Sequence, residues 1–127
     1  MRPVIEDLAA FLKARLDEDE QDARSLLAVA QHMTGRTRND DPAWVSVQMM
    51  CVRALRDVEA KRELITFAFE NAAQIDGEWG DGHEAGEIAA GLCTDHGAKA
   101  ALRALRPLVN VYSNHHGYRE EWARETA

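Results

Sequence analysis

The sequence predicts an all-α protein: two long antiparallel helices with shorter C-terminal helices packed on them. Alanine, leucine, glutamate and arginine dominate the composition, and all four favour helices. Only three prolines and three phenylalanines occur among the 127 residues. Apolar residues recur every three or four positions over two long stretches, as one face of a helix requires. This length and an apolar content of 46% fit one domain over residues 1–127, in which 114–127 form an extended or flexible tail.

The first helix is expected over residues 4–33. Ile5, Leu8, Leu12 and Leu16 form its apolar stripe, which an acidic run at 17–22 interrupts for about one turn. The residues that resume the stripe are Ala23, Leu26, Leu27, Ala30 and Met33. No glycine or proline lies between residues 4 and 33, so we expect the helix to continue through that run. Gly35 then fits a C-cap position.

The second helix is expected to begin at Pro42, with Asp41 as its N-cap, and to end near residue 73. Arg62 interrupts its apolar stripe, and we expect this side chain to reach water at the edge. Other apolar residues lie off the stripe, which predicts that more than one face is covered. The stripe contains Trp44, Val47, Cys51, Leu55, Val58, Ile65 and Phe69, and the off-stripe residues are Met49, Val52 and Phe67.

Shorter elements fill the C-terminal half. A glycine-rich loop at 76–82 is followed by a predicted short helix at 84–92 and a turn at 93–97. The last helix starts near Ala98, and Pro107 should end or kink it at Arg106. Two roles are open for the tail residues Tyr118 and Trp122. The sequence favours the first, in which they fold back and cover the helices; in the second, they form an aromatic interaction surface.

The charge balance argues against nucleic acid as a partner. Fifteen basic and 22 acidic residues give a net charge of -7, which repels phosphate backbones. A basic face would arise only if two helices were neighbours and brought their arginines together. These are Arg53, Arg56, Arg103 and Arg106. The partner expected instead is another protein or a second copy of this chain.

The chain is expected to be cytoplasmic. No stretch approaches the roughly 18 apolar residues of a membrane-spanning helix, and the N-terminus turns acidic where a signal peptide needs an apolar run. Two cysteines, Cys51 and Cys93, do not make a disulfide framework.

One combination of residues is compatible with zinc. Cys93 and His96 have a spacing seen in zinc knuckles, and two further histidines complete a tetrahedral set. The predicted ligands are His83, Cys93, His96 and His116. Alternatively, Cys93 packs as a small apolar residue, His83 starts a helix and the other histidines are exposed. No phosphate-binding glycine motif appears, so the sequence indicates no catalytic residue and no cofactor other than this possible zinc ion.

Four segments are distinctive in combination: LAAFLKARLDEDE at 8–20, VRALRDVEAKR at 52–62, EWGDGH at 78–83 and HGYREEW at 116–122. Together they resemble a family of small uncharacterised proteins from actinobacteria and their phages. The resemblance implies an actinobacterial or phage origin, and it implies no activity. The sequence therefore predicts a non-enzymatic interaction module that binds through a helix face or the aromatic tail. The alternatives are a zinc-stabilised domain and, less favoured, a small hydrolase that uses Cys93 or a bound metal.

Overall fold

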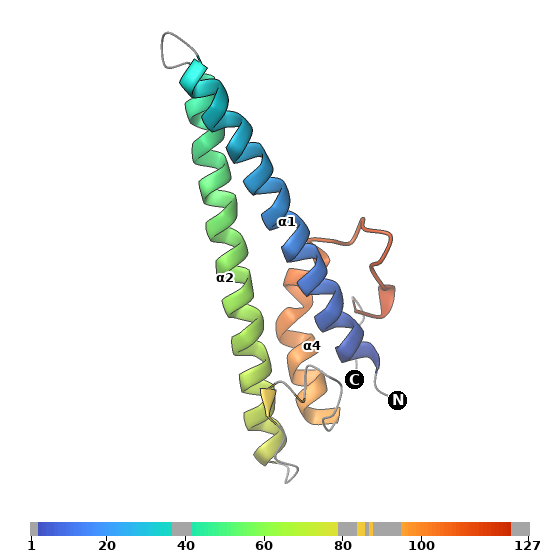
Figure 1. Ribbon diagram of the computed structural model, residues 1–127. Coiled ribbons are helices and arrows are strands. Elements are labelled where there is room, and N and C mark those ends of the chain that lie inside the picture. The colour runs from blue at the N-terminus through green and yellow to red at the C-terminus, as the bar shows by residue number, and fades with distance from the viewer. Residues whose placement is uncertain (1–2, 37–41, 79–83, 86, 88–94, 123–127) are drawn as a thin grey trace. The chain divides into compact units, whose positions relative to one another are not determined.

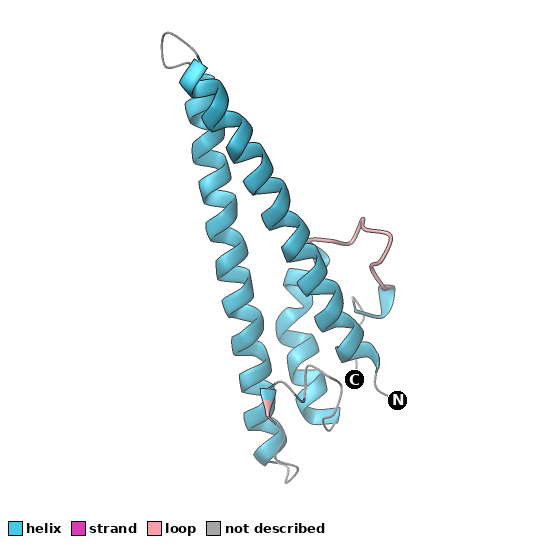
Figure 2. Ribbon diagram, in the orientation of Figure 1, coloured by secondary structure: helices cyan, strands magenta, loops and turns pink. Residues whose placement is uncertain are grey.

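The computed structural model describes residues 3–36, 42–78, 84–85, 87 and 95–122 (Figures 1 and 2). They form α1 (Pro3–Arg36), α2 (Pro42–Glu78), α4 (Asp95–Asn110) and a short 3-10 helix, η1 (Glu120–Trp122). None of these residues is in a β-strand. The predicted all-α class is confirmed. Within the same part of the chain, no helix combines the length and apolarity needed to cross a membrane.

The chain divides into two compact units, which are described separately. Unit 1 contains Met1–Ala14 and Glu63–Ala127, and unit 2 contains Arg15–Arg62. Unit 2 is an antiparallel hairpin made by the second part of α1 and the first part of α2. Two contacts establish its direction: Arg62 meets Asp17, and Gln48 meets Thr34.

Unit 1 has three helical segments around one core. The start of α1, the end of α2 and α4 all contribute buried side chains, so the shorter helix packs on the two long ones as predicted. Trp122 of η1 completes the cluster. The other members are Leu8, Leu12, Ala68, Phe69, Ala72, Ala101, Leu102, Leu105, Leu108 and Val109.

Helix α1 is continuous through the acidic run, as predicted. The stripe resumes beyond the run, where Ala23 and Ala30 are buried, but Leu26, which the sequence also places on it, is 48% exposed. The prediction that Gly35 caps the helix is wrong, because α1 extends one residue further, to Arg36. Gly35 is exposed and a side chain there would meet nothing, so no packing contact forces the chain to turn at this residue.

Helix α2 begins at Pro42, as predicted, but it ends at Glu78 rather than near residue 73. Ala72 is buried and Ala73 packs against the core of unit 1, which holds this last part of the helix in place. Gly77 lies within the helix and is exposed. A helical glycine costs only about 1 kcal/mol relative to alanine, so packing of the preceding turn outweighs it.

The sequence predicts that Pro107 ends or kinks the last helix at Arg106, and the first of these alternatives is wrong. Helix α4 begins at Asp95 and runs through Pro107 to Asn110. Proline removes one hydrogen bond and costs about 3 kcal/mol inside a helix. Leu108 and Val109 are buried in the final turn, and burial of two such side chains offsets that cost at about 1.5–3 kcal/mol each.

The predicted short helix at 84–92 lies mostly outside the described residues. Ala85 and Glu87 are helical. The backbone N–H of Glu84 donates to Oε1 of Glu87 at 3.1 Å, and the Glu87 N–H donates to the Glu84 carbonyl at 3.0 Å. This reciprocal pair is typical of a helix N-terminus.

Candidate functional site

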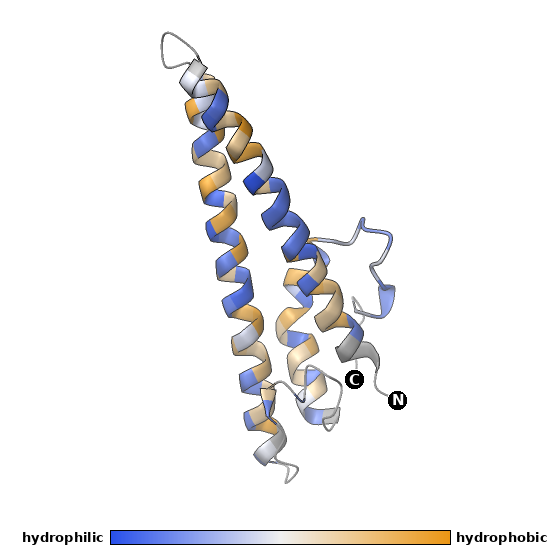
Figure 3. Ribbon diagram, viewed as in Figure 1, coloured by the Kyte–Doolittle hydropathy of each residue, from blue (hydrophilic) through white to orange (hydrophobic). Residues whose placement is uncertain are grey.

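The fully buried side chains of unit 2 are mostly small, whereas larger ones such as Trp44 and Leu55 are half-buried. The buried apolar seam consists, in the described chain, of Leu16, Ala23, Ala30, Cys51 and Val58. Two helices alone bury one stripe each, and a third layer normally covers what remains apolar. Here larger apolar side chains stay exposed, with Met49 and Met50 at 64% and 67%. The others are Leu26, Val29, Val45 and Val52. Figure 3 shows that apolar residues occur along both helices of this unit.

A groove of about 350 Å³ lies between α1 and α2 in unit 2. Apolar side chains line one part of it, chiefly Leu26, Met50 and Ala54, with the buried seam beneath. Carboxylates line the other part. These acids are Asp19 and Asp22 of α1 and Asp57 of α2. We call this surface the acidic groove.

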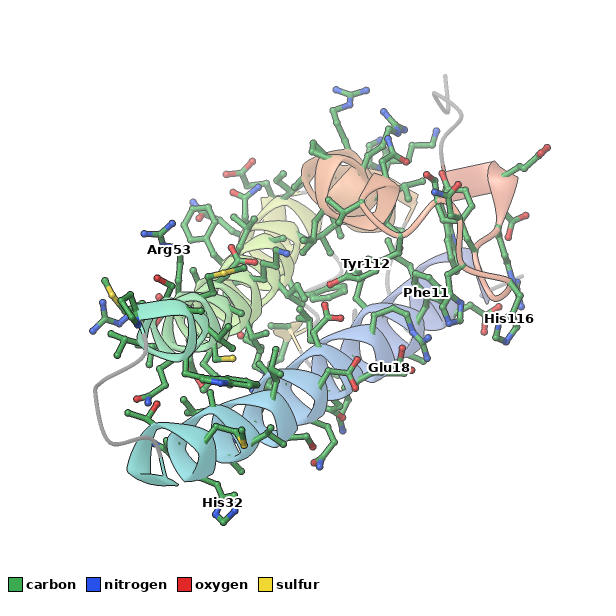
Figure 4. All side chains as sticks on the ribbon, turned by 90° about the horizontal axis from the view of Figure 1, so that it is seen from above. Phe11, Glu18, His32, Arg53, Tyr112 and His116 are labelled. Carbon is green, nitrogen blue, oxygen red and sulfur yellow. The ribbon has the colours of Figure 1, made fainter. Side chains whose placement is uncertain are left out.

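A second depression, of about 340 Å³, lies on α2 alone. Val45, Met49 and Val52 supply its apolar part, and Arg53 and Arg56 supply positive charge. Figure 4 shows Arg53 on the side of α2 turned away from α1. We call these five residues the basic face. Their spacing of three to four residues places them on one side of the helix.

Arg62 braces the two helices of unit 2. Its Nη2 atom lies 2.9 Å from Oδ1 of Asp17, and its Nη1 atom pairs with Glu20 on α1 and, at 3.8 Å, with Glu59. The hydrogen bond from Arg62, with a second from Arg24, lowers the pKa of Glu20. The same contact with Glu20 raises the pKa of Arg62. The predicted contact of Arg62 with water at the edge of the stripe is therefore only part of its environment. Arg62 is held by carboxylates of the neighbouring helix, with its side chain 33% exposed.

The structure does not bring the predicted zinc ligands together. His83 and Cys93 lie outside the described residues. His96 is exposed in the first turn of α4, and His116 is exposed beyond the end of that helix, stacked on His115 at 4.3 Å. The described part of the chain contains no group of three or more potential ligands. Zinc binding stays a prediction, which metal analysis of untagged protein tests.

The tail aromatics pack against unit 1. Trp122 is 1% exposed, and its ring lies 4.9 Å from Phe11 and 5.7 Å from Tyr118. Nε of Arg106 donates to the Trp122 carbonyl at 3.3 Å, and the Tyr118 hydroxyl donates to Asn110 at 2.9 Å. Figure 4 shows Phe11 and Tyr112 in the same region. The favoured interpretation, in which these aromatics cover the helices, is confirmed. Partner binding through Tyr118 and Trp122 stays a prediction.

The four arginines of the possible basic patch belong to different units. Arg53 and Arg56 lie in unit 2, whereas Arg103 and Arg106 lie on α4 in unit 1. Neither unit therefore carries all four. The pair on α2 adjoins an exposed apolar surface that both residues help to line.

A family model matches residues 5–124. The chain belongs to DUF6221. This is a family of unknown function, so membership assigns no activity. No curated protein and no solved structure is significantly similar to the chain. In this DUF6221 protein, both the acidic groove and the basic face fall within the matched region.

Sequence reasoning missed the acidic groove. It treated the acidic run as a solvated turn and assigned the off-stripe residues to a second covered face. In the structure Met49, Val52 and Phe67 are exposed instead. The signal that was available is the pair Met49 and Met50. Two adjacent methionines outside the stripe place flexible apolar side chains on two outward sides of one helix.

Proposed function

We propose that this DUF6221 protein is a non-enzymatic interaction module that binds a partner helix in the acidic groove of unit 2. One observation carries the proposal. Large apolar side chains are exposed along a two-helix hairpin whose own seam is built mainly from alanine, cysteine and valine. Exposed apolar patches of this kind are typical of interaction surfaces. A groove between two helices is a common receptor for an amphipathic helix.

The lining of the groove indicates which helices would bind. Leu26, Met50 and Ala54 would cover an apolar stripe, and methionine adapts its shape to the bound side chains. Asp19, Asp22 and Asp57 favour a helix whose stripe is flanked by arginine or lysine, and they disfavour an acidic one.

A binding role fits this chemistry better than a catalytic one. The groove offers carboxylates and one thiol, that of Cys51, which is only 3% exposed. Nucleophilic catalysis needs an accessible thiol beside a base. The alternatives of a zinc-stabilised domain or a hydrolase depend on Cys93 or on ligands such as His83, which lie outside the described residues.

The resemblance noted in the sequence supports an actinobacterial or phage origin. On that basis the partner is sought in an actinobacterial cell. A small module that consists of a helical groove needs nothing more than complementary shape and charge to act on another protein.

Site-specific photocrosslinking tests the proposal. A photoreactive amino acid replaces Met50 in the groove, and a matched variant carries it at Ala28, which is exposed on α1 and lines neither surface. We expect light-dependent protein adducts from position 50 and not from position 28, in purified protein or in an actinobacterial extract. Equal labelling from both positions, or no adduct from position 50, would refute binding at the groove.

A further inference from the structure

We propose that the acidic groove of one copy receives the basic face of a second copy, so that the protein forms a homodimer through unit 2. This inference rests on the proposed function, because it names the partner of the same groove. The chain itself contains a helix with the required chemistry. The basic face presents Val45, Met49 and Val52 with Arg53 and Arg56 beside them.

The two surfaces are complementary in charge. Three carboxylates line the groove, one of which, Asp57, also pairs with Lys61 at 2.8 Å, and two guanidinium groups belong to the basic face. Arginine pairs with carboxylates through a planar fork of donors, which gives such contacts a defined geometry. Groove-to-groove association would instead place Asp19, Asp22 and Asp57 against the same acids, and like charges at an interface oppose binding. Charge therefore selects the unlike pairing.

The groove has a direction along its length. On α1, Leu26 lies seven residues after Asp19, which is about 10 Å along the helix. On α2, Met50 lies seven residues before Asp57, again about 10 Å. Since the two helices are antiparallel, both apolar residues fall toward one end of the groove and both acids toward the other.

The basic face has the same order and the same length. Met49 lies seven residues before Arg56, about 10 Å along α2. A second α2 that lies in the groove parallel to the first therefore places its methionine on Leu26 and Met50, and its arginines among the carboxylates. The antiparallel orientation would place the arginines on the apolar end, where their charges would be desolvated without partners.

The two surfaces lie on different sides of one helix. The pairing of a groove with a basic face is therefore head-to-tail. Each dimer leaves one groove and one basic face free, and these can bind further copies at higher concentration.

Measurement of molar mass in solution tests the proposal with the full chain. We expect a dimer that forms as concentration rises, followed by larger assemblies. The variant Met50→Glu should weaken the Kd of this association about ten-fold to a hundred-fold, the equivalent of removing one buried apolar side chain and adding a like charge. Ala28→Glu adds the same charge outside both surfaces and should leave the Kd unchanged. A monomer at all concentrations up to about 1 mM, which reveals even a millimolar Kd, would overturn the proposal.

A charge exchange tests the pairing itself. The double variant Arg53→Glu/Arg56→Glu reverses the basic face, and Asp19→Lys/Asp22→Lys reverses the acidic groove. We expect each variant alone to be monomeric and their mixture to form a heterodimer, since every groove then meets a face of opposite charge. Circular dichroism verifies that each variant is helical. Failure of the mixture to associate, or dimers of either variant alone as stable as those of the unaltered chain, would overturn the pairing.

The two proposals can fail separately. A monomeric chain that still gives adducts from position 50 with a different protein keeps the groove as an interaction site and removes the homodimer. A dimer that gives no adduct from position 50 removes the groove as its interface and overturns both.

Discussion

Replacing Trp122 by alanine tests whether the tail is part of the core of unit 1. The indole is 1% exposed and contacts the rings of Phe11 and Tyr118. If the tail merely lies on the surface, this change should barely alter the free energy of unfolding. If the tail completes the core, the change should lower that free energy substantially.

The size of the effect follows from the buried area. A tryptophan buries about 150–250 Å², which at about 25 cal/mol per Å² corresponds to roughly 4–6 kcal/mol. Measured changes from Phe or Trp to Ala fall at about 3–5 kcal/mol. We therefore expect Trp122→Ala to lower the free energy of unfolding by about 3–5 kcal/mol. A chain of 127 residues has a total of roughly 6–19 kcal/mol.

Urea unfolding followed by far-ultraviolet circular dichroism measures this loss. Because the sequence predicts a single domain, we expect one transition that shifts as a whole. Glu121→Ala, an exposed change in the same 3-10 helix, should cost less than about 0.5 kcal/mol, and Trp122→Phe should restore most of the loss. If Trp122→Ala costs less than about 1 kcal/mol, the tail does not complete the core.

Three further outcomes are expected from unit 2 and unit 1. The lowered pKa of Glu20 means that its stabilising contribution is complete above its ordinary value of 4.5 and is lost as pH falls through the lower folded value. Glu20→Gln removes this titrating group, so its free energy of unfolding should fall less steeply with decreasing pH than that of the unaltered chain. An unchanged pH profile would contradict the stabilising role of the pairing with Arg62. Arg119 lies 2.6 Å from Asp7 but is half exposed, so Arg119→Ala should cost under about 1 kcal/mol in urea unfolding; a larger loss would contradict this. Pro107→Ala should raise the thermal midpoint, because it restores a helical hydrogen bond, and a lower midpoint would show that the ring stabilises α4.

The sequence predicted those elements whose cause is local. The continuity of α1 follows from the lack of glycine and proline in residues 4–33, and the start of α2 follows from Pro42. The errors fall where tertiary packing outweighs a local preference. Gly77 and Pro107 are unfavourable in helices, yet buried neighbours such as Ala72 and Val109 hold these turns.

The groove was harder to predict than the helices. Periodicity identifies apolar faces, but it does not tell which face a third helix will cover. In unit 1, α4 and Trp122 supply that cover. In unit 2 the described chain leaves Met49 and Met50 exposed. The predicted stripe of α2 is buried or half-buried in both units, and it is the apolar residues outside it that stay on the surface of unit 2.

The acidic run at 17–22 illustrates how helical geometry divides neighbouring residues. Asp17 and Glu20 hold Arg62, whereas Asp19 and Asp22 line the groove. At 3.6 residues per turn these pairs point to different sides of α1. Neutralising the first pair should loosen the hairpin while sparing recognition, and neutralising the second should do the reverse. A continuous run of acidic residues thus contributes both to the stability of the hairpin and to recognition at the groove, and evolution can change either property without loss of the other.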